Sequence, residues 1–188
     1  MVKYYELLTE LQYVDISHKK LQALVSHPRF KAWFRNSKVV DKDGWPMVCY
    51  HYSSTTNFKL FSPFSHFGTQ EAALSRAEYV RVTDLNQGQT IQVLLSIQNP
   101  LEIPDLTVHN YENYRKYLIS ENIFRESDLP KITSDTNMLL LQKLLLKKGI
   151  DGFKYENLTE HSGSISWITL KPTQAMPLFK ILSLVLEK

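Results

Sequence analysis

The stretch VCYHYSS (residues 48–54) is a short apolar run that ends in a histidine followed by small hydroxyl residues. Residues 45–50 are apolar apart from Pro46, and the turn signal Asp43-Gly44 precedes them, so the pattern predicts a buried strand. His51 falls where this strand is expected to end, a place where a rigid element can hold a side chain against a ligand. His51 is therefore the first candidate functional residue.

Size and composition predict one ordinary globular domain. The chain has 188 residues, of which 43% are hydrophobic and 22% are charged, and it is rich in aromatic residues. Its formal net charge is +3, and the basic residues are scattered among acidic ones. This distribution predicts neither a nucleic-acid-binding stripe nor a helix that lies on a membrane surface.

Cys49 is the only cysteine, so the chain cannot form an intramolecular disulfide. The six histidines lack the spacing of metal ligands, and we expect no metal cofactor. The first six residues lack the apolar core of a signal peptide, and no apolar run approaches the roughly 20 residues of a membrane span. We expect a soluble, cytoplasmic protein, and delivery into a host or target cell is compatible with that expectation.

The periodicity of the chain predicts a mixed α+β domain. Residues 1–34 are expected to form an N-terminal helical cap, and residues 35–188 one folding unit. Thr69 and Asn110 are expected helix N-caps, and Ser134 is the expected cap of a Leu-rich helix that Gly149 ends. We expect strands over residues 38–41, 47–51, 90–97, 150–155 and 165–170, whereas residues 178–186 fit a strand or a helix.

Several segments resemble, in the same order, small bacterial and phage ADP-ribosyltransferase domains of the polyvalent-protein type. The resemblance covers residues from about 33 to 175. Its pieces are WFRNSKVVDKDGWP (33–46), the strand into His51, FKLF (58–61), HFGT (66–69) leading into a helix, LSIQNPL (95–101), KGIDGFKYEN (148–157), and GSISWI (163–168) followed by PTQ (172–174).

This resemblance implies a split β-sandwich that binds NAD as a substrate in a cleft between two small sheets. It implies an enzyme of the glycosyltransferase class that moves ADP-ribose from NAD to a macromolecular acceptor, which we expect to be a protein, and releases nicotinamide. Such domains occur in bacterial effectors and toxins. Cleavage of the bond between nicotinamide and ribose passes through a cation resembling an oxocarbenium ion, which a nearby carboxylate can stabilise.

The resemblance also implies site residues. His51 would contact the NAD ribose, and Ser53 or Ser54 would neighbour the nicotinamide amide. Tyr52 stands where the family often has glycine. The second motif comprises His66, Phe67, Gly68 and Thr69, with Thr69 also the expected helix cap. Phe67 or Tyr79 would stack on a ring of NAD, and Arg76 would meet the phosphates or pair with Glu71 or Glu78.

A carboxylate that stabilises the ribosyl cation is the least defined part of this expected site. In eukaryotic-type members the carboxylate would fall on Ser166, which cannot supply one. The loop before the last strand offers Glu160, our expected catalytic residue, with Glu156 as a second choice. Two alternatives stay open: a degenerate module that binds NAD or a protein without turnover, and an RNA-cleaving toxin that uses His51, His66 and Glu160.

Overall fold

The fold is taken from a computed structural model, which describes residues 18–54, 60–83, 88–131 and 135–181. The helices described are α2 (His18–Ser26), α3 (Pro28–Phe34), α4 (Gln70–Thr83), α5 (Tyr111–Ser120) and α6 (Asp135–Lys147), with 3₁₀ turns at Glu126–Asp128 and Pro172–Gln174. The strands are β1 (Cys49–Ser53), β2 (Ser65–Phe67), β3 (Gln89–Leu95), β4 (Pro100–Glu102), β5 (Gly152–Asn157), β6 (Ser164–Thr169) and β7 (Ala175–Pro177).

The described strands form two sheets. One has the order β1-β3-β7 with antiparallel pairing throughout, and the other has the order β2-β6-β5-β4, in which only β4 and β5 are parallel. The sheets meet where Tyr50 of β1 and Gly68, just after β2, exchange backbone hydrogen bonds of 2.9 and 3.0 Å. This junction brings the expected strand histidine beside the HFGT segment.

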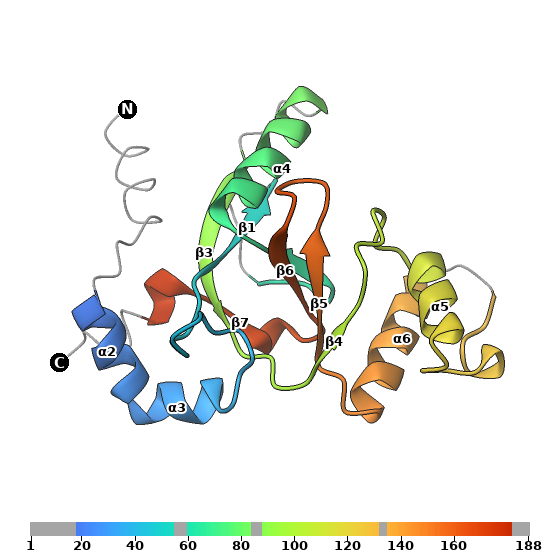
Figure 1. The fold of residues 1–188 in the computed structure, drawn as a ribbon, viewed down its shortest axis with the longest axis horizontal. Helices are drawn as coiled ribbons and strands as arrows, with labels where there is room; N and C mark the ends of the chain where they lie inside the picture. Colours follow the sequence, from blue (N-terminus) through green and yellow to red (C-terminus); the bar gives the residue numbers. More distant parts are fainter. Residues whose placement is uncertain (1–17, 55–59, 84–87, 132–134, 182–188) are drawn as a thin grey trace.

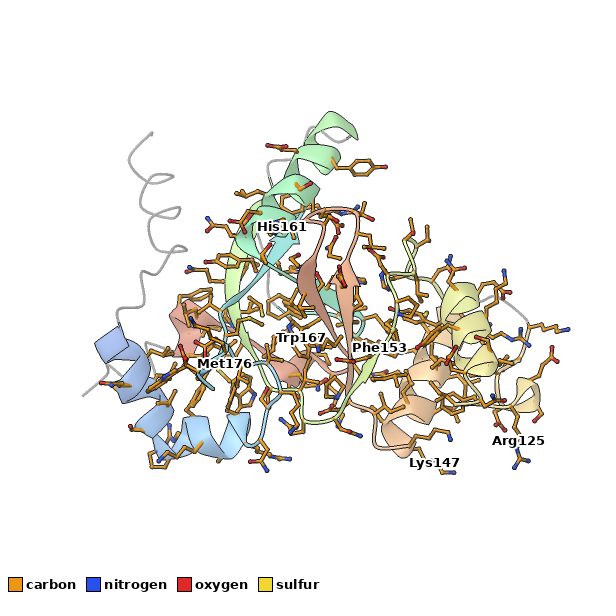
Figure 2. All side chains as sticks on the ribbon, viewed as in Figure 1. Arg125, Lys147, Phe153, His161, Trp167 and Met176 are labelled. Carbon is orange, nitrogen blue, oxygen red and sulfur yellow. The ribbon has the colours of Figure 1, made fainter. Side chains whose placement is uncertain are left out.

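Alternation along the strands places the four-stranded sheet in the middle of the molecule. Trp167 packs with Phe67 and with Val93 of β3 in the core between the two sheets, whereas its neighbour Ile168 joins the core on the opposite face. The residues labelled Trp167 and Phe153 accordingly lie on different sides of this sheet (Figure 2).

Helices cover the outer faces of both sheets (Figure 1). The α5–α6 pair packs on the four-stranded sheet through the fully buried residues Tyr114, Leu118 and Leu145. On the other side, α2 and α3 bring Leu24 and Phe30 against Leu94 of β3, whose side chain points away from the core between the sheets. Helix α4 lies along β1, at the top of Figure 1.

The expected helix ends are confirmed where they are described. The Thr69 hydroxyl accepts from the backbone N–H of Ala72 at 3.2 Å, and the Asn110 side chain accepts from that of Asn113 at 2.9 Å. Gly149 follows α6 with a φ of +81°, which favours glycine. Ser134 lies outside the described residues.

The strand predictions needed several corrections. Residues 38–41 do not form a strand, because Val40 makes only an isolated bridge to Pro46 while the Asp41 carboxylate accepts from the backbone N–H groups of Asp43 and Trp45. Strand β1 continues to Ser53, so His51 lies in its middle, opposite Ile91. Residues 178–181 are helical, and β7 immediately precedes them.

The described part of the chain thus forms a mixed α+β structure with two sheets. Among its helices, none has the length and apolar character needed to cross a bilayer. Residues 1–17, which carry much of the expected N-terminal helical cap, lie outside the described ranges.

Candidate functional site

A cleft of about 860 Å³ opens beside the junction of the two sheets. This volume lies within the range of roughly 300–1,000 Å³ that is typical of small-molecule sites. Strands β1 and β2, helix α4, the loop after β4 and the ends of β5 and β6 form its walls. The lining residues include Tyr50, His51, Tyr52, Ser65, His66, Phe67, Gly68, Arg76, Tyr79, Asp105, Thr107, Val108, His109, Tyr155, Asn157, Thr159, Glu160 and Ser166.

Most of the residues expected from the sequence line this cleft. They are His51, Tyr52, His66, Phe67, Gly68, Arg76, Tyr79 and Glu160. Ser53, Ser54 and Thr69 are not among its lining residues: Ser53 is buried at the end of β1, Ser54 is exposed beyond it, and Thr69 caps α4. The hydroxyl groups expected beside nicotinamide therefore lie away from the cleft.

Glu156 is also separated from the cleft. It lies on β5 between Tyr155 and Asn157, which both line the cleft, and successive side chains of a strand point to opposite faces. Glu156 is exposed and lines a different hollow, of about 470 Å³, on the other face. Of the two glutamates expected in this region, only Glu160 faces the cleft.

His51 is held by both backbone and aromatic contacts. Its Nδ1 lies 2.7 Å from the carbonyl oxygen of His66, and because a carbonyl can only accept, Nδ1 carries the proton. The rings of Phe61 and Phe67 each lie 5.3 Å from the imidazole, measured between centroids. Burial lowers the pKa of His51 despite the hydrogen bond to the carbonyl, which acts in the other direction.

Asn157 braces the loop that carries Glu160. The Oδ1 atom of Asn157 accepts from the backbone N–H groups of Thr159, Glu160 and His161 at 2.9, 2.8 and 3.3 Å. Its Nδ2 donates to Oε2 of Glu160 at 2.8 Å and to Oγ of Ser166 at 3.2 Å. Asn157 is only 2% exposed, so a buried side chain at the end of β5 fixes the carboxylate.

The Glu160 loop is also tied to α4. The Thr69 hydroxyl lies 2.8 Å from Nδ1 of His161, and the same nitrogen lies 3.9 Å from a carboxylate oxygen of Glu71. His161 is labelled at the top of the β5–β6 hairpin, beside α4 (Figure 2). Thr69 therefore helps to place the loop rather than lining the cleft.

The wall formed by β2, β5 and the loop after β4 contains residues that the sequence did not single out. His66 Nδ1 lies 3.0 Å from the Tyr155 hydroxyl, and the imidazoles of His66 and His109 meet edge to face with centroids 4.4 Å apart. His109 Nδ1 lies 3.0 Å from the Tyr114 hydroxyl, and its Nε2 lies 3.6 Å from the Asp105 carboxylate.

The histidines of the cleft are held neutral. Burial, together with the neighbouring His109, His51 and Arg76, lowers the pKa of His66 to about 3. Burial also lowers the pKa of His109, although Asp105 opposes this effect. At neutral pH the charges that line the cleft are consequently those of Arg76, Asp105 and Glu160.

Arg76 and Tyr79 stand together on α4 at the exposed side of the cleft. The guanidinium carbon of Arg76 lies 5.5 Å from the centre of the Tyr79 ring, which is 66% exposed. Within the described residues, no carboxylate lies at ion-pair distance from Arg76, so the expected alternative of pairing with Glu71 or Glu78 is not observed. Arg76 is therefore available to an anionic ligand.

The lowered pKa values predict a loss of stability in acid. The folded pKa of His66 is about 3 and its ordinary value is 6.5, so the unfolded chain binds more protons between these values. Stability contributed by neutral His66 is complete above pH 6.5 and is lost as pH falls toward 3, by up to about 1.4 kcal/mol per pH unit. Urea unfolding at pH 7.5 and 5.0 measures this change, and His66→Gln should flatten it. Equal stability at both pH values would contradict the burial of neutral imidazoles.

The fold and the cleft define a mixed α+β protein with a ligand-sized site beside the junction of two sheets. Searches against protein-family models, curated proteins and solved structures found no match to this chain. Within the described residues, no group of three or more histidine, cysteine or acidic side chains is arranged to hold a metal ion.

Proposed function

We propose that the protein is an NAD-dependent mono-ADP-ribosyltransferase that transfers ADP-ribose to a protein acceptor. The observation that carries the proposal is the position of Glu160: its carboxylate lines the same cleft as His51, more than 100 residues earlier in the chain, and a buried asparagine braces it. The order of segments that resembles ADP-ribosyltransferases supports the same conclusion. The proposed fold within the α+β class is the split β-sandwich of that family.

In the proposed reaction, the bond between ribose C1′ and the nicotinamide nitrogen breaks, and its electron pair leaves with nicotinamide. Positive charge develops on the ribose, where the Glu160 carboxylate stabilises it. A nucleophile of the acceptor forms the new bond to C1′ and loses its proton. Neutral His51 and His66 add no positive charge that would oppose the forming cation.

Residues on the other walls of the cleft are the proposed contacts for the remaining parts of NAD. His51 is the proposed partner of a ribose hydroxyl, with Phe61 and Phe67 packed around its ring. Arg76 is the proposed partner of the pyrophosphate, because it is exposed on the cleft side of α4. Tyr79 or Phe67 provides an aromatic surface for a ring of NAD.

A binding module without turnover is the second candidate. The positions of Ser53 and Ser54 favour it, since neither serine lines the cleft where nicotinamide would need hydroxyl partners. The RNA-cleaving alternative is less suitable, because the pKa of His66 is about 3 and such a histidine is not protonated to act as a general acid at neutral pH.

Calorimetry with NAD, combined with assays of nicotinamide release and of labelled ADP-ribose transfer to bacterial lysate proteins, tests the proposal. The folded wild-type protein should bind NAD, release nicotinamide and label a protein band. Binding without release would favour the binding module instead. No NAD binding at millimolar concentration, with folding verified by circular dichroism, would overturn the enzyme and the NAD-binding module and would leave a module that binds a protein.

A further inference from the structure

A continuous series of side chains links His66 to Glu160 across the floor of the cleft. The Tyr155 hydroxyl lies 3.0 Å from Nδ1 of His66, and Ser166 is the cross-strand partner of Tyr155 in the β5–β6 pair. Ser166 in turn accepts from Nδ2 of Asn157 at 3.2 Å, and the same nitrogen donates to Glu160 at 2.8 Å. We call Tyr155, Ser166 and Asn157 the relay.

The donors and acceptors of the relay can be assigned from one end. Oδ1 of Asn157 accepts three backbone N–H groups, so the orientation of its amide is fixed and Nδ2 is the donor toward Ser166. Ser166 Oγ accepts from Asn157 and keeps one proton to donate, for which the oxygen of its cross-strand partner Tyr155 is an acceptor. Burial raises the pKa of Tyr155 above its usual range. Tyr155 thus keeps its proton and donates it to Nδ1 of His66.

The tautomer of His66 follows from this order. A neutral imidazole that accepts at Nδ1 carries its proton on Nε2. Within the described residues, Nε2 of His66 has no hydrogen-bond partner, and this nitrogen is not fully buried, so it is accessible from the cleft that His66 lines. The edge-to-face contact with His109 fixes the ring plane.

The groups around His66 keep it neutral. His109, His51 and Arg76 would each repel a positive charge on this ring, and burial acts in the same direction. The Glu160 and Asp105 carboxylates instead raise the pKa of the neighbouring Tyr155, and they oppose the effect of burial on the pKa of His109. His66 therefore cannot exchange protons with a ligand at neutral pH, but it can donate a hydrogen bond.

We propose that His66 binds the ligand by donating its Nε2–H group to an acceptor oxygen of NAD. In this proposal the relay fixes the tautomer of His66 at one end and holds the Glu160 carboxylate at the other. The proposal rests on the proposed function. Both the nicotinamide carboxamide and the ADP-ribose phosphates supply suitable oxygens. The relay would then couple ligand binding at His66 to the position of the Glu160 carboxylate.

Nitrogen-15 NMR of the imidazoles tests the tautomer without any ligand. In the wild-type protein, His66 should show a protonated Nε2 and an unprotonated Nδ1, unchanged between pH 8 and 5. Tyr155→Phe removes the hydrogen-bond donor to Nδ1, so the chemical shifts of both His66 nitrogens should move toward those of a mixture of the two tautomers. A protonated Nδ1 in the wild type, or a titration near pH 6.5, would overturn the inference.

Titrations with NAD, with nicotinamide and with ADP-ribose then identify the oxygen. A shift of the His66 Nε2 resonance with nicotinamide assigns the carboxamide, and a shift with ADP-ribose assigns the other half of NAD. His66→Gln can present an amide N–H near the position of Nε2 and should keep the NAD Kd within about threefold, whereas His66→Leu should raise it by about tenfold. Circular dichroism checks that each variant is folded.

The two proposals can fail separately. If NAD shifts the resonances of His51 but leaves those of His66 unchanged, the role of His66 is overturned and the proposed function stands. If none of the three ligands binds, the proposed function is overturned, and so is the assignment of NAD as the ligand of His66. The tautomer measurement without ligand still decides whether the relay operates as described.

Discussion

Glu160→Gln should lower the rate of nicotinamide release by on the order of 100- to 1,000-fold while leaving the affinity for NAD nearly unchanged. The carboxylate acts on positive charge that exists only in the transition state, so its removal raises the barrier rather than weakening binding. Glutamine has nearly the same shape, and its amide oxygen can still accept from Asn157 Nδ2, which donates to Oε2 in the wild type. Calorimetry and a nicotinamide assay separate the two effects.

Glu156→Gln is the matched control, because it makes the same chemical change at an exposed position on the opposite face of β5. Its turnover should stay within about twofold of wild type, as expected for an exposed surface substitution. Equal losses in both variants would mean that overall charge, rather than the cleft carboxylate, determines the rate. An active Glu160→Gln variant would remove Glu160 from the mechanism.

Local signals in the sequence predicted the elements that depend on neighbouring residues. Thr69 and Asn110 act as helix caps because their side-chain oxygens reach backbone N–H groups within three residues. Gly149 ends α6 because its positive φ disfavours side chains. Each of these features needs only a few consecutive residues to be recognised.

Features that depend on distant pairing were less predictable. The parallel pairing of β4 with β5 joins segments about 50 residues apart, and the short Pro100–Glu102 strand carries no alternation of its own. His51 was expected at a strand end but lies mid-strand, because β3 supplies partners as far as Ser53. Pairing with another strand, rather than the local pattern, sets the length of β1.

In the candidate site, too, features set by neighbouring residues were predictable and features set by distant contacts were not. Glu160 could be expected near the cleft, because the turn closed by Gly163, with a φ of +83°, folds the loop back. Asp105 and His109 lie in an irregular loop whose path depends on packing against β5, and nothing in their spacing indicated it. Ser166 was noted only as lacking a carboxylate, yet it accepts a hydrogen bond from Asn157 and lies opposite Tyr155 in the β5–β6 pair.

Asn157→Asp should reduce nicotinamide release by about 10- to 100-fold at neutral pH, with activity recovering as pH rises. An aspartate keeps the oxygen that accepts the N–H groups of residues 159–161, so the loop stays capped. Its second oxygen, however, replaces the Nδ2 that lies 2.8 Å from the Glu160 carboxylate. Two carboxylates this close cannot both ionise at low cost, so the pair takes up a proton and its upper pKa rises.

The rate of nicotinamide release between pH 6 and 9 measures this effect, because the pair regains its full negative charge only above the raised pKa. Asn122→Asp, at an exposed position that does not line the cleft, makes the same substitution and should leave the pH profile unchanged. Asn157→Ala should instead destabilise the fold by about 2–4 kcal/mol, since the backbone N–H groups of residues 159–161 lose their buried acceptor. A fully active Asn157→Asp at pH 7 would show that catalysis does not need the ionised Glu160 carboxylate.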